Sequence, residues 1–272
     1  MTEVKENAVP EAAAQEVKAK SVKRSKASPS GKSKSRFGKH GKKYTDALAK
    51  VTLGKRYKVD EAFRLLPEVS YAKFDETVDI AFNLGVDPKH AEQMVRGALV
   101  LPHGIGKSVR VAVLAKGDKA REAEAAGADS VGAEDLIEKI AGGWMEFDKL
   151  IATPDMMVAV TKVGKILGPR GLMPNPKLGT VTFEVTKAIK EQKLGKIEYR
   201  TEKSGIIHVL IGKKSFGAEK LKENFIALAG AIVKAKPPTS KGTYLEKITL
   251  STTMSPSIIM DSMDVLETAG LA

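Results

Sequence analysis

The stretch that decides the fold is YAKFDETVDIAFNLGVD, residues 71–87. Apolar residues occupy every second position along its length: Val78, Ile80, Phe82 and Leu84. This spacing predicts an extended strand with one apolar and one polar face. Such a strand is typical of an antiparallel sheet that packs one face on a core and leaves the other in water. An open sheet face is therefore the first structural expectation for this chain.

A different pattern begins at residue 108. The run SVRVAVLA (108–115) is almost continuously apolar, as a strand buried on both faces of a parallel sheet would be. Strand and helix patterns then alternate, with Asp118 predicted as a helix N-cap and Gly127 as a helix stop. We expect strands at 108–115, 147–154 and 180–185, and helices at 118–129, 133–143, 155–168 and 186–194. This alternation predicts a parallel sheet covered by helices.

Elements of the antiparallel kind lie on both sides of this block. We expect a helix that begins at Val59 and that Pro67 ends, two strands around a turn at 196–200 and 206–212, a helix at 218–236 and a closing strand at 244–254. The predicted fold class is thus mixed α/β and α+β in two domains. A discontinuous antiparallel-sheet domain (44–103 and 196–272), backed by helices, carries an inserted parallel-sheet α/β domain (104–195). Glycines near the two crossings predict a hinge: Gly104, Gly106 and Gly195.

The excess positive charge is concentrated near the N-terminus. The chain carries a formal charge of +12, from 45 Lys and Arg against 33 Asp and Glu. Residues 1–43 hold twelve of the basic and four of the acidic residues, so this segment contributes +8. A Lys-, Ser- and Gly-rich composition with little to bury predicts a basic tail that is disordered when free. We expect it to lie on a polyanion such as RNA, and a purely solvated tail is the alternative.

Composition also excludes several classes of protein. The absence of cysteine rules out disulfides and thiol chemistry, and the four histidines (His40, His90, His103 and His208) show no metal-ligand spacing. Four glutamates near the N-terminus argue against a secretory or transit peptide, and no apolar run reaches the roughly 18 residues of a membrane span. We therefore predict no metal, no cofactor and no membrane association.

Two enzyme readings also fail. The segment GIGKS (104–108) resembles the end of a phosphate-binding loop, but Leu101 occupies the position where that motif needs its first glycine, and a strand rather than a helix follows. Asp75, Glu76 and Asp79 are close in sequence, yet Glu76 points to the opposite strand face from the other two. No catalytic residue is predicted. A DNA-binding protein that acts through its tail remains a further alternative.

Several separated stretches, in their order, resemble one known family. They are AKFDETV (72–78), VRGALVLPHGIGK (95–107), EAEAAGAD (122–129), GGWMEFD (142–148), ATPDMM (152–157), ILGPRGLMPNPK (166–177), KSGIIH (203–208) and STTM (251–254). Between about residues 44 and 260 the chain resembles bacterial large-subunit ribosomal protein one, of the mobile stalk beside the tRNA exit site.

The resemblance implies the same two-domain fold and a monomer within the cytoplasmic ribosome. It also implies binding to the stalk region of 23S rRNA, a part in the release of deacylated tRNA from the exit site, and repression of translation from the protein's own operon messenger RNA.

The same resemblance implies an RNA-binding surface formed by two distant segments. Its residues are Lys73, Phe74 and Thr77 in the first segment and Ser251, Thr252, Thr253, Met254 and Ser255 in the second, with Arg200, Lys203 and His208 as an extension. Thr253 is expected to hydrogen-bond a ribose or base edge, and Met254 and Phe74 are expected to pack on the nucleotide. Strand filling for Thr253 and core packing for Met254 and Phe74 are the alternatives. Ser255 is a departure, because the family usually has glycine there.

Overall fold

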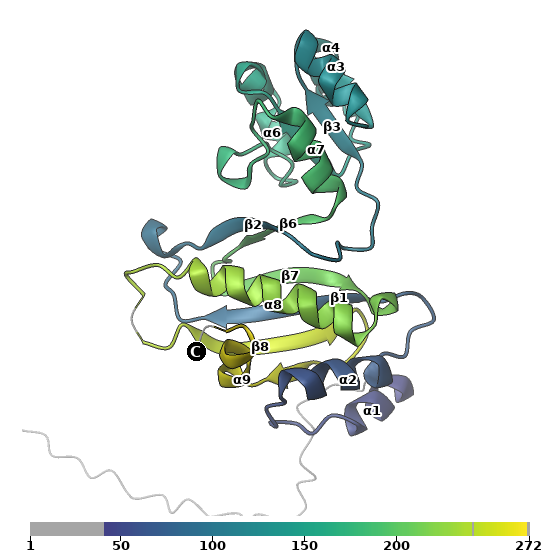
Figure 1. Cartoon of the computed structure of the whole chain (residues 1–272), viewed down its shortest axis with the longest axis vertical. Coiled ribbons are helices and arrows are strands. Elements are labelled where there is room, and N and C mark those ends of the chain that lie inside the picture. Colours follow the sequence, from purple (N-terminus) through teal and green to yellow (C-terminus); the bar gives the residue numbers. More distant parts are fainter. Residues whose placement is uncertain (1–40, 241, 271–272) are drawn as a thin grey trace, which may run out of the picture. The chain divides into compact units, whose positions relative to one another are not determined.

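The computed structural model describes residues 41–240 and 242–270. The predicted tail (1–43) therefore lies outside the described residues, apart from its last three. Lys42 and Lys43 belong to helix α1 (Lys42–Ala49), so this helix begins before the expected Tyr44. The fold class is confirmed: the chain is mixed α/β, with an antiparallel sheet and a separate parallel sheet (Figure 1).

The antiparallel sheet joins strands that are far apart in sequence. Its order is β7-β1-β8-β9. The bounds are β1 (Thr77–Leu84), β7 (Ile206–Lys213), β8 (Leu245–Thr252) and β9 (Ile258–Met260). The alternation predicted for β1 is confirmed, because Val78, Ile80, Phe82 and Leu84 are all buried. A parallel bridge from Tyr57 to Met260 covers the outer edge of β9.

Helices cover the apolar face of this sheet. Besides α1 they are α2 (Val59–Val69), α8 (Ala218–Lys234) and α9 (Ser262–Thr268), and α8 runs alongside the strands (Figure 1). Phe225 of α8 is the centre of the core. Its ring stacks on Phe82 of β1 at 6.2 Å between centroids and meets Phe63 of α2 at 5.6 Å.

The prediction that Pro67 ends its helix is wrong, since α2 continues to Val69. A proline removes one backbone hydrogen bond, here the bond that would reach back to the carbonyl of Phe63. Leu66 and Val69 are buried in the core and hold the last turn in place without that bond. Packing of apolar side chains therefore outweighs the local preference of proline.

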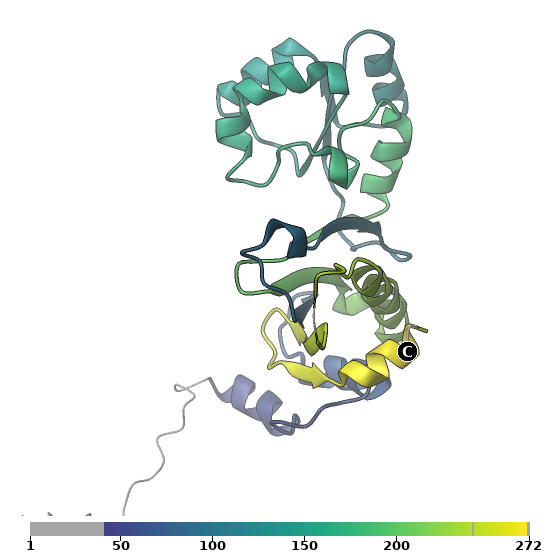
Figure 2. The same ribbon diagram turned by 90° about the vertical axis from the view of Figure 1, so that its left-hand side faces the viewer.

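The parallel sheet has the order β4-β3-β5. Its strands are β3 (Val111–Leu114), β4 (Ser130–Gly132) and β5 (Lys149–Ala152), and its helices are α3 (Asp118–Ala125), α4 (Glu134–Ala141), α5 (Met157–Lys162), α6 (Gly164–Leu167) and α7 (Val185–Lys193). Helices lie on both sides of this sheet (Figure 2). Val111 and Val113 of β3 belong to a cluster with residues of α3 and α7, while Ala112 and Leu114 belong to a cluster with residues of α4, α5 and α6. Burial on both faces explains why β3 reads as a continuous apolar run.

Three predictions in this region are corrected. The strand expected at 180–185 is reduced to a single bridge between Ala152 and Val181, because the hydroxyl of Thr182 accepts a hydrogen bond from the Glu184 amide and turns the chain into α7. The helix expected at 155–168 is broken near Val163 into α5 and α6, preceded by the 3₁₀ turn η2 (Pro154–Met156). Asp118 is the first residue of α3 rather than its N-cap, which is Gly117. The short strand β4 was not predicted.

The two strands expected around a turn at 196–200 and 206–212 are both present, but they do not pair with each other. Strand β6 (Lys196–Arg200) pairs with β2 (Arg96–Val100) as a separate two-stranded antiparallel ribbon, whereas β7 pairs with β1. Three 3₁₀ turns complete the described elements: η1 (Ala91–Gln93), η3 (Pro176–Leu178) and η4 (Lys214–Phe216).

The glycines predicted as a hinge lie where two chain segments touch. Gly104, Gly106 and Gly195 all have positive φ, at +66°, +75° and +99°. A Cβ atom on Gly195 would lie 2.7 Å from the Cα of Gly104, so only glycine fits this close approach. The hinge motion itself and the predicted domain bounds stay predictions.

Replacement of the central aromatic ring provides a test of the core. We expect Phe225→Ala to lower the free energy of unfolding by about 3–5 kcal/mol, because it removes a fully buried ring and leaves a cavity. Chemical denaturation followed by circular dichroism measures this change. The matched control is Phe74→Ala, whose ring is mostly exposed, and which should change stability by less than about 1 kcal/mol. Equal losses in the two variants would contradict this account of the core.

Candidate RNA interface

The outer face of the antiparallel sheet is polar but not strongly basic. Its central residues come from β1, β8 and β7 in turn: Thr77, Asp79, Ala81 and Asn83; Lys247, Thr249 and Ser251; His208 and Leu210. None of these side chains is buried. Hydroxyl groups suit ribose 2′-hydroxyls and base edges, because each can both donate and accept a hydrogen bond. The composition of this face favours contacts to sugars and bases over contacts to phosphates.

At one end of this face, the carboxylate of Glu76 holds two segments together. Glu76 is fully buried at the start of β1. Its Oε1 accepts a hydrogen bond from the Ala72 amide at 2.7 Å. Its Oε2 accepts one from the Thr252 hydroxyl and a longer one, 3.4 Å, from the Met254 amide. One side chain therefore fixes both the 72–74 loop and the turn after β8.

These hydrogen bonds keep Glu76 ionised. Burial alone raises the pKa of the Glu76 carboxyl, but hydrogen bonds from the Thr252 hydroxyl and the Ala72 and Met254 amides outweigh burial and hold the pKa below its ordinary value. A buried carboxylate that loses one of these donors would be left poorly satisfied, which is unfavourable. The geometry of both segments is therefore coupled to one charge.

The 72–76 loop is also held from its other side. Both carboxylate oxygens of Asp75 accept hydrogen bonds from Ser215, at 3.0 Å from the amide and 2.7 Å from the hydroxyl. The backbone oxygen of Glu76 accepts a bond from the Lys214 amide at 2.8 Å. Lys73 and Phe74, which are both exposed, are thus presented by a loop whose neighbours are tied down.

Thr77 and Thr253 meet across the end of the sheet. The Thr77 amide donates to the Thr253 hydroxyl at 3.1 Å, and the Thr253 amide donates to the Thr77 carbonyl at 3.1 Å. A bulge in β7 brings Lys213 opposite Thr77, where its ammonium donates to the Thr77 hydroxyl at 3.3 Å. The exposed Thr253 hydroxyl can accept a further hydrogen bond, because a hydroxyl oxygen has two lone pairs. The two predicted segments are therefore in direct contact.

Most of the predicted residues lie together at this junction. Phe74 is 56% exposed and Met254 is 48% exposed, so core packing, the alternative for both, is excluded. Ser251 is half-buried, while Lys73 and Thr253 are exposed. We call the following set the junction patch: Lys73, Phe74, Thr77, Ser251, Thr253 and Met254.

Two of the predicted residues are used inside the protein. Thr252 is buried, and its hydroxyl donates to Glu76, so the prediction that it faces RNA is corrected: its parity places it on the inner side of β8. The hydroxyl of Ser255 accepts from the Thr252 amide at 3.0 Å and donates to the Pro256 carbonyl at 3.1 Å. Serine at this position therefore closes the turn after β8, and a direct contact of Ser255 with RNA stays a prediction.

The predicted extension of the surface is divided between two places. His208 lies on β7, on the outer sheet face, opposite Ala81 in the ladder. Partial loss of hydration on this face raises the pKa of Asp79, an effect that the nearby His208 opposes. Arg200 and Lys203 instead line a groove at the end of the β2–β6 ribbon, so they do not extend the junction patch through a hairpin with β7.

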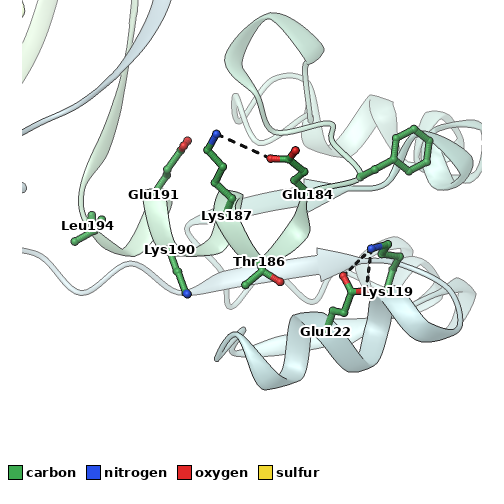
Figure 3. Close-up of a pocket in the computed structure, with 9 residues that line it drawn as sticks. Lys119, Glu122, Glu184, Thr186, Lys187, Lys190, Glu191 and Leu194 are labelled. Carbon is green, nitrogen blue, oxygen red and sulfur yellow. Dashed lines mark hydrogen bonds and ion pairs between the residues drawn. The ribbon is translucent and has the colours of Figure 1, made fainter.

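A second groove lies between α3 and α7. Its volume is about 720 Å³, and its charged residues are three lysines and three glutamates: Lys119, Lys187, Lys190, Glu122, Glu184 and Glu191. Two of the lysines are paired with glutamates of the same wall, as Figure 3 shows for Lys119 with Glu122 and Lys187 with Glu184. Because its charges cancel, this groove has no electrostatic preference for a polyanion.

Other kinds of site are not supported by the described residues. Within 41–240 and 242–270, no three His, Asp or Glu side chains are grouped so that they could hold a metal ion. None of the helices in the same ranges combines the length and apolar character needed to cross a bilayer.

Sequence reasoning missed the residues that support the patch. Glu76 was recognised only as pointing away from Asp75 and Asp79. Its parity with Val78 and Ile80 was the available signal, because a charged residue on the buried face of a strand needs internal partners. No comparable signal pointed to Lys213, whose position depends on the bulge in β7.

An open, hydroxyl-rich sheet face with a rigid, exposed aromatic and thioether at its end is typical of a protein that binds folded RNA. The comparison with known protein families gives the same class. The model of the ribosomal protein L1p/L10e family matches residues 66–256, which is more than half of the chain, and the chain belongs to this family. It is accordingly a structural, rRNA-binding component of the large ribosomal subunit, in a family of RNA-binding proteins rather than enzymes.

The buried carboxylate gives a pH-dependent contribution to stability. The pKa of Glu76 in the folded chain is below its ordinary value of 4.5, so its stabilising effect is complete above that pH and is lost as pH falls through the folded-state pKa. We expect Glu76→Gln to lower the free energy of unfolding by about 1–3 kcal/mol at pH 7, the scale of lost hydrogen bonds to a buried charge. The difference from the parent should shrink below pH 4.5. Urea denaturation at a series of pH values measures it.

The control for this experiment is Glu68→Gln on α2, where the side chain is exposed. It should show little difference from the parent at any pH. A Glu76→Gln deficit that stays constant down to about pH 3, or grows there, would contradict the role assigned to the carboxylate.

Proposed function

We propose that the junction patch binds the stalk region of 23S rRNA. The observation that carries this proposal is the direct contact between Thr77 and Thr253, which brings two segments that are 176 residues apart in sequence into one surface. The family's rRNA-binding role supports a site for folded RNA, and the chemistry of this patch suits one.

The patch has the groups that shape-specific RNA recognition requires. In an A-form helix the accessible minor groove presents 2′-hydroxyls and base edges, while unstacked bases offer flat apolar faces. The hydroxyls of Ser251 and Thr253 suit the first kind of contact. The ring of Phe74 and the thioether of Met254 suit the second. Lys73 adds a phosphate contact at the edge.

Preorganisation strengthens such a site. Exposed loops normally lose conformational freedom when they bind, which reduces affinity. Here the hydrogen bonds to Glu76 and Asp75 already hold the loop that carries Lys73 and Phe74. The protein therefore orders little of its own backbone when RNA binds.

Substitution of the turn after β8 tests the proposal. We expect Thr253→Val combined with Met254→Ala to weaken binding to a transcript of the rRNA stalk region by about 1–3 kcal/mol, through lost polar and packing contacts. Filter binding at fixed salt measures the affinity. Because Thr253 also bonds to Thr77, thermal unfolding of the variant must be measured in parallel.

Phe74→Ala provides the second, structurally silent variant. Its ring is mostly exposed, so reduced RNA affinity with unchanged stability would support the patch. The comparison variant is Phe183→Ala, whose ring is equally exposed but lies in the α/β region. If Phe74→Ala binds as tightly as Phe183→Ala and the parent, the proposed site is wrong.

We further propose that the same surface binds a stalk-like structure in the protein's own messenger RNA and so represses its translation. A patch that reads sugars and shape accepts any RNA that presents the same fold. Competition between the two RNAs for one protein checks this: a messenger fragment should displace the rRNA fragment, and the Thr253 and Met254 double variant should lose both. The role in releasing tRNA from the exit site rests on the resemblance and stays a prediction.

A further inference from the structure

The β2–β6 ribbon places two arginines directly opposite each other. In its antiparallel register Arg96 is the cross-strand partner of Arg200. Directly opposed residues share one face, with their side chains only a few ångströms apart, and like charges in such a pair repel. Both side chains are exposed. Because such a pair destabilises the ribbon, its presence suggests that the two arginines have a function.

The neighbouring charges on the same strand are compensated. Lys196, Glu198 and Arg200 lie on one face of β6, because alternate residues of a strand share a face. Lys196 forms an ion pair with Glu191 at 2.9 Å, and Glu198 forms one with Lys149 at 2.7 Å. Among the described residues, no carboxylate lies within ion-pairing distance of Arg200 or of its partner Arg96.

A groove opens beside this pair. Its volume is about 810 Å³, and Arg200, Lys203 and Met94 contribute to its lining. A guanidinium nitrogen of Arg200 lies 3.8 Å from the sulfur of Met94, a contact that holds the side chain over the groove without neutralising it. Glu202 is the acidic residue of the lining. The lining therefore has two cations against one carboxylate, and Arg96 lies opposite one of them, Arg200, in the ladder.

We infer that Arg96 and Arg200 together hold one phosphate group of an RNA backbone, at a contact separate from the junction patch. Guanidinium groups present paired N–H donors that match phosphate oxygens, and two of them side by side can bind the same phosphate. The anion would also remove the repulsion between the two arginines. This inference rests on the proposed RNA-binding function and adds a phosphate contact to it.

The phosphate can come from the stalk rRNA or from a second RNA, such as tRNA. In the first arm, binding of the stalk-region transcript is measured for the parent, Arg96→Gln, Arg200→Gln and the double variant at several salt concentrations. In the second arm, deacylated tRNA is added to the preformed complex of each protein with the transcript. Arg64→Gln on α2, an exposed arginine on the helical side of the sheet, is the matched control.

Each single variant should weaken binding in one of the two arms by about tenfold. It should also reduce the magnitude of the slope of log affinity against log salt by about 0.7–0.9, as expected for one lost phosphate contact. The double variant should be little worse than either single variant, because both arginines serve the same phosphate. An effect in the first arm assigns the phosphate to the stalk RNA, and an effect only in the second assigns it to tRNA.

Stability without RNA gives an independent readout. Because repulsion is relieved, either single variant should unfold at a temperature equal to or about 1 °C above that of the parent. Parent-like affinity of all variants in both arms, or fully additive losses in the double variant, would overturn the inference. If the parent itself fails to bind the transcript, the proposed function fails instead, and direct binding of tRNA to the free proteins still decides the arginine pair.

Discussion

The interaction on which the candidate site depends is the buried carboxylate of Glu76. Its side chain is shielded from solvent, and it is stabilised by hydrogen bonds from groups that belong to two distant segments. A charge in such a place enforces geometry, because any movement of Ala72 or Thr252 removes one of its hydrogen-bond donors. The exposed residues on either side therefore hold their positions without being buried themselves. Buried hydrogen bonds of this kind can hold an exposed surface in one conformation.

Two chemistries that RNA recognition usually combines are unevenly distributed in this structure. The open sheet face carries mainly hydroxyls, together with His208, Lys247 and the carboxylate of Asp79, and Lys73 lies at its end. In the ribbon, two arginines without a carboxylate partner, Arg96 and Arg200, lie directly opposite each other. Contacts to phosphates position a protein on nucleic acid, whereas contacts to bases and sugars distinguish one RNA from another. In the two proposals above, the junction patch makes most of the contacts to sugars and bases, and the ribbon adds a contact to phosphate.

Local patterns in the sequence predicted the elements better than their partners. The alternation around β1 and the apolar run at β3 each reflect how many faces of the strand are buried, so both could be recognised directly. The pairing of β6 with β2 rather than with β7 depends on contacts between distant residues, and no local pattern encodes it. Pro67 and the 180–185 segment show the same limit. Core packing outweighed the helix-ending preference of Pro67, and a turn at Thr182 outweighed the strand preference of 180–185.

The candidate site was also predicted only in part. Resemblance located the junction patch, whereas strand parity favoured burial of Phe74, which is exposed. The alternation of β8 was enough to predict that Thr252 faces inward, because Thr252 lies two residues after the buried Leu250. Its partner Glu76 likewise lies on the inward-facing side of β1. A search for polar residues on apolar strand faces therefore identifies this pair from the amino-acid sequence.

The position of β8 between β1 and β9 has a consequence for biosynthesis. β1 is made before the parallel-sheet region and β8 after it, yet they are neighbours in the sheet. The parallel-sheet region lies between them in sequence, and its strands pair only with one another, so it has the partners it needs while the ribosome is still adding residues. The surface that joins Thr77 to Thr253 forms only after the chain has emerged as far as β8 and the turn that follows it. An incomplete chain, from a truncated messenger or a stalled ribosome, would lack that surface and would not compete with finished copies for RNA.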